Sequence, residues 1–215
     1  MRMKVAPSIL SADFGKMAEA VQNVKIWGAD LVHCDVMDGV YVPNITFGMP
    51  MIKALRKYSD MVLDVHLMIT KPEKYVGQFC DAGADIVTFH PEASANVQLA
   101  LDEIKNKGKK CGLVINADQP FEIVEDYLDQ IDLLLIMTVQ AGFGGQSFKP
   151  ECVEKAKRAQ ELRLQFGYNY MIEVDGGVSP LNVEMLKDAG VDIVVAGNSV
   201  FKSENPTLTI KQMQI

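Results

Sequence analysis

The chain has 215 residues, of which 48% are hydrophobic and 23% charged. This composition is ordinary for a globular protein and excludes a disordered, collagen-like or coiled-coil description of the whole chain. The net charge is −7 and no run of five basic residues occurs, which argues against nucleic acid and anionic membranes as partners. An acidic chain that binds an anion must do so through local groups, such as backbone N–H groups, a metal ion or a few cations.

The N-terminal region and the cysteines indicate the compartment. The first residues, Met-Arg-Met-Lys, lack the apolar core of a signal peptide, and no apolar stretch approaches about 18 residues. The four cysteines lie far apart with no CxxC pair: Cys34, Cys80, Cys111 and Cys152. Reduced and mostly buried thiols are therefore expected, in a cytoplasmic protein that does not span a membrane.

A short pattern repeats along the chain. Gly28-Ala29-Asp30-Leu31-Val32 recurs in similar form at 83–87 and 190–194, and a weaker copy without the glycine occupies 130–134. The pattern predicts a helix that ends at a glycine, a tight turn and then entry into a buried strand. Further apolar, β-rich runs lie before the first copy, at 4–9, and between the copies, at 61–67, 111–115 and 170–174.

These runs predict eight strands separated by amphipathic helices. Alternation of strands and helices predicts a parallel sheet, and eight such units in a chain of this length match a (β/α)8 barrel, the TIM barrel. A doubly wound open sheet is the alternative. Because no Gly/Pro/Ser-rich linker divides the chain, we predict a single domain over residues 1–215.

In such a barrel the active site lies at the carboxyl ends of the strands, and the polar residues there predict a metal site. His33 and Asp35 alternate along the second strand and so share one face. His66 lies near the end of the third strand and Asp175 at the end of the seventh. Two imidazoles and two carboxylates suit Zn²⁺, Fe²⁺, Mn²⁺ or Co²⁺. The remaining histidine, His90, also follows a strand, but we do not count it as a ligand.

Neighbouring polar and sulfur-containing side chains have simpler interpretations. Asp38 is expected to cap the turn at Gly39, while Asp64 and Glu173 lie a layer deeper and are expected to orient the ligands or to bond within the barrel. Cys34 should face the helices. Three methionines near strand ends would form an apolar collar around the metal: Met37, Met68 and Met137.

Glycine-rich segments follow the last three predicted strands and favour a phosphate site. Glycines there let backbone N–H groups approach a phosphate closely, often with the help of a short helix. Each segment alone is also compatible with a plain turn. The segments are Gly142-Phe143-Gly144-Gly145-Gln146, Gly176-Gly177 and Ala196-Gly197-Asn198-Ser199.

At these residues the chain resembles the ribulose-phosphate 3-epimerase family. The resemblance extends from residue 6 to residue 201, and its most specific stretches are 33–39, 42–48, 66–68, 142–148 and 174–178. It implies a (β/α)8 barrel of the ribulose-phosphate-binding type. It also implies an isomerase of carbohydrate metabolism, in the pentose phosphate pathway, that interconverts D-ribulose 5-phosphate and D-xylulose 5-phosphate through a C2–C3 enediolate.

The resemblance also implies roles for individual residues. His33, Asp35, His66 and Asp175 would hold one divalent metal ion, Zn²⁺ or Fe²⁺ first and Mn²⁺ or Co²⁺ as alternatives. Asp35 and Asp175 would be the two acid/base groups. The residues implied in binding the substrate or its phosphate are Ser8, His66, Gly142, Phe143, Gly144, Gly145, Gly176, Gly177, Gly197 and Asn198. The expected partners are a small sugar phosphate and further copies of the chain in a homo-oligomer, a dimer or larger.

Three departures from the family pattern bear on substrate preference and efficiency. Gln140-Ala141 replaces an Asn or acid followed by Pro, Ala117 replaces a proline, and Asn198 replaces a serine. Losing two prolines leaves two loops less restricted in φ. An allulose-6-phosphate 3-epimerase therefore remains an alternative.

Two more distant alternatives remain. A lyase of another phosphosugar barrel would tend to carry a lysine beside the acidic residue of the third strand, where this chain has Val65-His66. A non-catalytic binding protein would need a damaged site, but every predicted ligand and acid/base position is intact.

Overall fold

The computed structural model describes residues 2–215, and in them eight strands alternate with helices. The strands are β1 (Lys4–Pro7), β2 (Leu31–Met37), β3 (Val62–Met68), β4 (Ile86–Phe89), β5 (Lys110–Ile115), β6 (Leu133–Met137), β7 (Met171–Asp175) and β8 (Ile193–Ala196). The helices are α1 (Met17–Ile26), α2 (Met49–Arg56), α3 (Val76–Ala82), α4 (Val97–Asn106), α5 (Glu122–Glu125), α6 (Val153–Phe166), α7 (Val183–Asp188), α8 (Asn198–Phe201) and α9 (Pro206–Met213).

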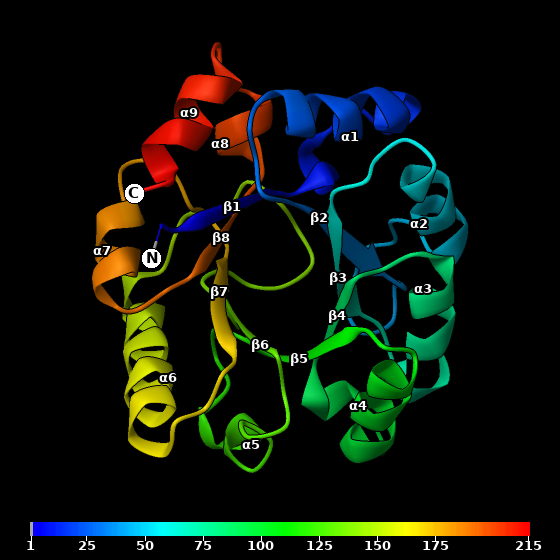
Figure 1. Ribbon diagram of the computed structural model, residues 1–215, viewed down its shortest axis with the longest axis vertical. Coiled ribbons are helices and arrows are strands. Elements are labelled where there is room, and N and C mark those ends of the chain that lie inside the picture. Colours follow the sequence, from blue (N-terminus) through cyan, green and yellow to red (C-terminus); the bar gives the residue numbers. More distant parts are fainter. Residues whose placement is uncertain (1) are drawn as a thin grey trace.

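All strand pairs are parallel, and the strands form a nearly closed barrel. The order is β1-β8-β7-β6-β5-β4-β3-β2, and an isolated parallel bridge between Ser8 and His33 brings the two edge strands together. Figure 1 shows the helices arranged around the strands. The prediction of a (β/α)8 barrel is confirmed, and the open doubly wound sheet is excluded because its edge strands would not meet.

The strands separate two hydrophobic layers. Along β2, Val32, Cys34 and Val36 belong to the large cluster between strands and helices, whereas Leu31 and Met37 belong to the smaller cluster inside the barrel. This alternation is the period of two of a strand, and it turns the side chains at 33 and 35 toward the interior. Cys34 thus packs with the helix-facing core, as expected, and all four cysteines are buried and unpaired.

The repeated Gly-x-Asp pattern has a structural explanation. In three copies the glycine follows a helix and has a positive φ, of 84° at Gly28, 117° at Gly83 and 86° at Gly190, which glycine adopts most readily. The aspartate of every copy accepts a hydrogen bond from the backbone N–H of a residue in an earlier strand. The donor is the second residue of β1, β3, β5 or β7. The pairs are Asp30 with Val5, Asp85 with Leu63, Asp132 with Cys111 and Asp192 with Ile172, at 2.9, 3.0, 2.9 and 2.8 Å.

The last of these aspartates should contribute measurably to stability. Asp192 also pairs with the guanidinium of Arg163, which donates to the carbonyl oxygens of Tyr170 and Gly190. Replacing Asp192 by alanine leaves the Ile172 N–H and the guanidinium without this acceptor. We expect the free energy of unfolding to fall by about 1–3 kcal/mol.

Urea denaturation followed by circular dichroism measures this effect. Asp188→Ala is the control, because Asp188 is exposed on α7 and a surface substitution should change stability by no more than about 0.5 kcal/mol. Equal midpoints for the two variants would contradict the role given to Asp192.

Strand ends differ slightly from the predicted ones. The first strand was predicted to reach Ile9 but ends at Pro7, because Ser8 caps a 3-10 turn over Ile9–Ser11 and its Oγ accepts a hydrogen bond from the N–H of Leu10. The third and seventh strands start and end one residue later than predicted, and the fifth starts one residue earlier.

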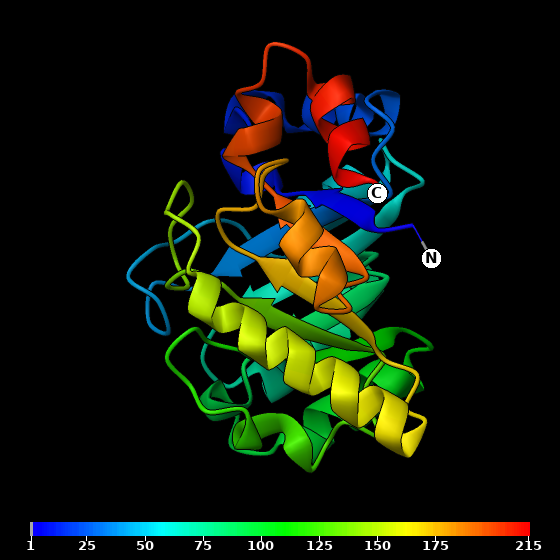
Figure 2. The same ribbon diagram turned by 90° about the vertical axis from the view of Figure 1, so that its left-hand side faces the viewer.

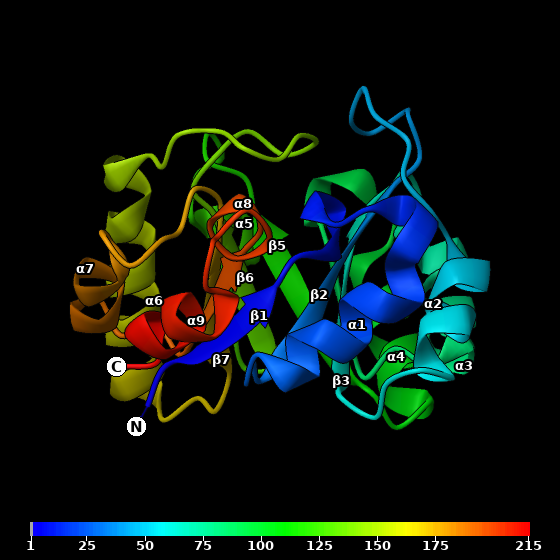
Figure 3. The ribbon, with the colours of Figure 1, turned by 90° about the horizontal axis from the view of Figure 1, so that it is seen from above.

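Two long loops rise from the carboxyl end of the barrel. They follow β2 and β6, and Figures 2 and 3 show them projecting from the same end, in light blue and yellow-green. The side-chain amide of Asn44 in the first loop donates to the carbonyl oxygen of Gly142 in the second, at 2.9 Å. Among residues 2–215, no helix combines the length and the apolar character needed to cross a membrane.

Candidate active site

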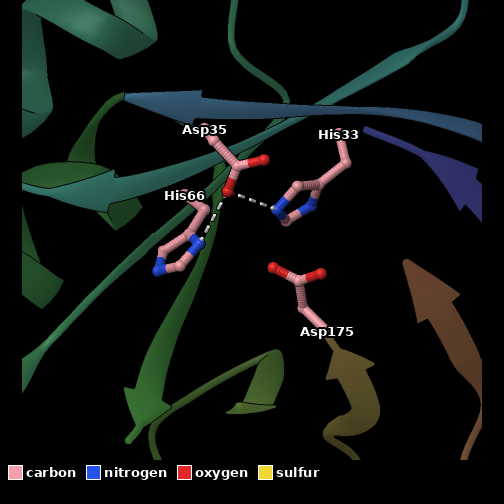
Figure 4. A group of neighbouring side chains, drawn as sticks. All are labelled: His33, Asp35, His66 and Asp175. Atoms are coloured by element: carbon pink, nitrogen blue, oxygen red, sulfur yellow. Dashed lines mark hydrogen bonds and ion pairs between the residues drawn. The ribbon is translucent and has the colours of Figure 1, made fainter. Parts of the chain in front are cut away.

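Three strands bring the four predicted metal ligands together inside the barrel. His33 and Asp35 come from β2, His66 from the neighbouring β3 and Asp175 from β7 across the barrel (Figure 4). One ligand atom from each residue can be chosen so that all four lie within 4.8 Å of one another. Register explains part of the arrangement, because Asp35 pairs with His66 along β2 and β3.

The donor atoms of this cluster suit a cation. Asp35 Oδ1 lies 3.3 Å from His33 Nε2 and 3.2 Å from His66 Nδ1. His33 Nε2 is buried and has no hydrogen-bond partner of good geometry within the described chain. An unpaired buried ring nitrogen beside two carboxylates is costly unless something binds it. These four residues could therefore hold one metal ion.

The charges of the four residues influence one another strongly. Burial alone would lower the pKa of His33, but the charges of Asp35 and Asp64 raise it well above its usual value. Burial opposes ionisation of Asp35, yet the charge and hydrogen bonds of His33 and His66 hold its pKa far below the usual range. Burial lowers the pKa of His66. Burial and the charge of Asp35 raise the pKa of Asp175 to about 7.

A deeper layer of carboxyl groups lies beneath His33, as expected. Asp64 Oδ2 lies 2.5 Å from His33 Nδ1, so the Asp64 carboxylate leaves Nε2 of that ring free to face the site. Glu173 lies behind this pair and is completely buried. Burial and the charge of Asp64 raise the pKa of Glu173 well above its usual value, which favours a protonated, uncharged side chain there.

Asp38 has the capping role predicted for it. One of its oxygens accepts hydrogen bonds from the N–H groups of Val40 and Tyr41, at 2.8 and 2.9 Å. The other accepts from the N–H of Thr70, at 2.8 Å. Asp38 thus ties the loop after β2 to the end of β3, away from the metal ligands.

A cavity of about 230 Å³ opens above the cluster at the carboxyl end of the strands. Asp35 and Asp175 line it, whereas His33 and His66 lie completely buried behind them. Of the predicted substrate- and phosphate-binding residues, those that line the cavity are Ser8, Gly142, Phe143, Gly144, Gly145, Gly176, Gly177, Gly197 and Asn198. The three methionines of the expected collar, Met37, Met68 and Met137, also line it. A direct contact of His66 with substrate stays a prediction.

One side of the cavity is built for close backbone approach. Gly177 has φ +65°, and a Cβ there would lie 2.5 Å from the backbone nitrogen of Phe148. A Cβ on Gly145, where φ is +78°, would lie 2.7 Å from Asn198 Nδ2. Among the described residues that line the cavity, none is a lysine or arginine. An anion held here would be bound by backbone N–H groups and uncharged side chains.

Several residues near the site were not predicted from the sequence to bind substrate or metal. Ser11, Gln146 and Ser199 line the cavity. Gln146 and Ser199 lie inside the glycine-rich segments, so their position along the chain was the available signal, and Ser11 lies two residues after the predicted first strand. His90 was not counted as a ligand, but its Nε2 lies 2.9 Å from His66 Nε2. Nothing in the sequence pattern indicated this contact.

Comparisons with known proteins agree with the geometry. The model of the Ribulose-phosphate 3 epimerase family matches residues 4–201. The chain belongs to this family. It is 47% identical to the ribulose-phosphate 3-epimerase of Synechocystis sp. over 94% of this chain and 88% of that protein. It is 42% identical to the ribulose-phosphate 3-epimerase of Escherichia coli strain K12 over 98% of this chain and 94% of that protein.

The barrel itself is shared more widely than the family. A crystal structure of KGPDC from Streptococcus mutans superposes with a TM-score of 0.77, covering 98% of this chain and 95% of that one, at 14% sequence identity. At that identity the likeness shows the fold alone. The family assignment therefore depends on sequence, and the roles of individual residues must be argued from the site.

Proposed function

We propose that this protein is an isomerase that interconverts D-ribulose 5-phosphate and D-xylulose 5-phosphate. The observation that carries the proposal is the pair of aspartates, Asp35 on β2 and Asp175 on β7, which line one cavity beside two buried histidines. Inverting a carbon centre requires an acid/base group on each face of the substrate. Two carboxylates from strands that are not neighbours can flank it.

His33, Asp35, His66 and Asp175 would hold one divalent cation. Their nitrogen and oxygen donors suit Zn²⁺, Fe²⁺, Mn²⁺ or Co²⁺, and the family resemblance places Zn²⁺ or Fe²⁺ first. When bound, the ion supplies positive charge that stabilises the negative charge developing on the substrate oxygens. The residues around the cluster hold it in shape: Asp64 orients His33, and the Ser8 hydroxyl donates to Asp35 Oδ2 at 2.6 Å.

The two aspartates would share the proton chemistry. One removes the proton on C3, next to the C2 ketone, to give an enediolate, and the other returns a proton to the opposite face. Their environments differ, since the pKa of Asp35 is far below its usual range and that of Asp175 is about 7. The pKa of Asp175 lies where a general acid or base works best near neutral pH, whereas Asp35 stays ionised there.

The glycine-rich side of the cavity would bind the phosphate, and Asn198 offers a direct test of this. Asn198→Asp places a carboxylate beside Gly145, where like charges would repel. We expect KM for the sugar phosphate to rise by an amount equivalent to about 1–3 kcal/mol, the size of a hydrogen bond to a charged group. Asn198→Ser is the matched control, because it keeps a neutral donor. An unchanged KM in Asn198→Asp would show that this side chain does not face the phosphate.

The six-carbon alternative, D-allulose 6-phosphate, remains because Gln140 and Asn198 line the cavity and both depart from the family pattern. A lysine-dependent lyase is disfavoured, since the residues lining the described cavity include no lysine. Steady-state assays of the metal-reconstituted protein on both sugar phosphates test the proposal. We expect the larger kcat/KM with D-ribulose 5-phosphate. Inactivity on both sugars in protein of verified metal content would refute the proposed reaction.

Three expectations about the whole chain also remain proposals. We propose that residues 1–215 form one domain, since the strands of the barrel extend from Lys4 to Ala196. A homo-oligomeric state and a cytoplasmic location stay predictions from the family resemblance and from the sequence.

A further inference from the structure

His66 contacts a second imidazole on the side away from the metal ligands. Its Nδ1 faces Asp35 Oδ1 at 3.2 Å, while its Nε2 lies 2.9 Å from the Nε2 of His90. Both rings are completely buried, and their centroids are 5.1 Å apart. Two N–H groups cannot point at each other at this distance, so one Nε2 donates the hydrogen bond and the other accepts it.

The surroundings of the other ring nitrogen of His90 favour one of these two assignments. His90 Nδ1 lies 3.6 Å from Oε1 of Glu92 and has no closer hydrogen-bond partner among the described residues. This distance is too long for a direct hydrogen bond. A carboxylate oxygen that close nevertheless attracts a ring N–H and repels a ring lone pair. Glu92 therefore favours a proton on Nδ1 of His90, which leaves its Nε2 as an acceptor. By the same argument Asp35 Oδ1, 3.2 Å from His66 Nδ1, favours a proton on that atom, so the pair of tautomers set by Glu92 is the one expected when a cation occupies His66 Nδ1.

Two neighbouring side chains hold Glu92 and His90 in this arrangement. Glu92 Oε1 accepts hydrogen bonds from the Tyr41 hydroxyl at 2.7 Å and from Asn116 Nδ2 at 2.9 Å. The Tyr41 ring also packs on the His90 ring, with centroids 4.8 Å apart. His90 is thus enclosed between the rings of Tyr41 and His66, and its opposite tautomer would point the lone pair of Nδ1 toward Glu92.

We propose that Glu92 and His90 are positioning residues that set the tautomer of His66. The Glu92 carboxylate directs the His90 proton to Nδ1, His90 Nε2 accepts the proton of His66 Nε2, and His66 Nδ1 is left bare toward the metal site. This proposal rests on the proposed function, because a bare Nδ1 is needed only if His66 is a ligand. His33, by contrast, is oriented by direct contact with a carboxylate, Asp64.

Nitrogen-15 NMR of the imidazole rings tests the tautomers directly. The chain has three histidines, so the spectrum of Zn²⁺-loaded protein can be assigned with single substitutions. We expect a neutral His90 that is protonated on Nδ1 and a His66 that is protonated on Nε2. A His90 protonated on Nε2 would overturn the proposal, and this measurement uses the wild-type protein.

Zn²⁺ affinity, measured by competition with a chromophoric chelator at fixed pH, tests the consequence. His90→Phe keeps a ring against Tyr41 but removes the acceptor, and we expect about 10- to 100-fold weaker binding. His90→Gln offers an amide oxygen near the position of Nε2 and should restore part of the affinity. Thr88→Val is the control: Thr88 is a buried residue of the same strand, β4, and its hydroxyl has no partner among the described residues.

Folding and the proposed metal centre are checked separately. Near-UV circular dichroism shows whether each variant is folded. If His90→Phe does not fold, Glu92→Gln takes its place, since it keeps an acceptor for Tyr41 while removing the charge, and we expect weaker Zn²⁺ binding there too. Wild-type Zn²⁺ affinity in the folded variant would overturn the positioning role of Glu92 and His90 but not the metal centre. A wild-type protein that binds no Zn²⁺ would refute the metal centre, and with it the positioning role of Glu92 and His90.

Discussion

Removing divalent metal ions with a chelator should abolish turnover, and adding back Zn²⁺, Fe²⁺, Mn²⁺ or Co²⁺ should restore it. The reason is the donor set: two ring nitrogens and two carboxylates lie within 4.8 Å of one another, and His33 Nε2 has no partner of good geometry in the described structure. Mg²⁺ should restore activity least, because it prefers oxygen ligands in octahedral geometry.

A second measurement separates metal binding from catalysis. A ligand that binds only the folded state stabilises it by about 2.7 kcal/mol at a concentration 100 times its Kd. Reconstitution should therefore raise the midpoint of thermal unfolding. Asp38→Asn is the control, because Asp38 ties two loops together rather than facing the cluster, and it should retain the metal-dependent shift. Full activity in protein verified to be metal-free would contradict the proposed metal centre.

Two elementary regularities made much of the site predictable. The period of two along a strand placed His33 and Asp35 on one face, and the carboxyl ends of parallel strands meet at one end of a barrel. Register then set Asp35 beside His66 across neighbouring strands. These arguments need only the backbone, and the structure brings the same four side chains close together.

The network behind His66 depends on information that strand periodicity does not carry. Register aligns His66 with Thr88, not with His90, which lies just beyond the end of β4. Contact between the two rings depends on how the chain turns after β4 and on the rotamers of both side chains. Asn116 and Tyr41 are 75 positions apart and come from different loops. Their convergence follows from loop conformation, on which an alternating pattern has no bearing.

The repeated Gly-x-Asp pattern was predictable in part. Its glycines predicted helix ends, and the structure gives each of three glycines the expected positive φ. The aspartates were part of the recognised pattern but had no assigned role. Each bonds to the backbone of a strand that precedes it by 20 to 25 positions. Such a pairing becomes visible only when the strand order is known.

Asp175→Asn should stop epimerisation while leaving proton exchange on one epimer. If each aspartate serves one face of the enediolate, the variant keeps only Asp35. A general acid/base group contributes about 10²- to 10⁴-fold to a rate, so the rate of epimerisation should fall at least 100-fold. In D₂O, Asp35 should still exchange the C3 proton of the epimer that presents its hydrogen to that face. Proton NMR of each sugar phosphate follows the exchange.

Asp35→Asn should reverse the preference, so that the other epimer exchanges. Metal content must be measured first, because Asp35 lies near nitrogens of both His33 and His66 and its loss should weaken metal binding more than the loss of Asp175. Asp13→Asn is the control: Asp13 is exposed and caps Gly15, a role that asparagine fills equally well. Two metal-loaded variants that exchange the same epimer would contradict the assignment of one carboxylate to each face, since a group fixed on one side of the substrate reaches only one of the two C3 hydrogens.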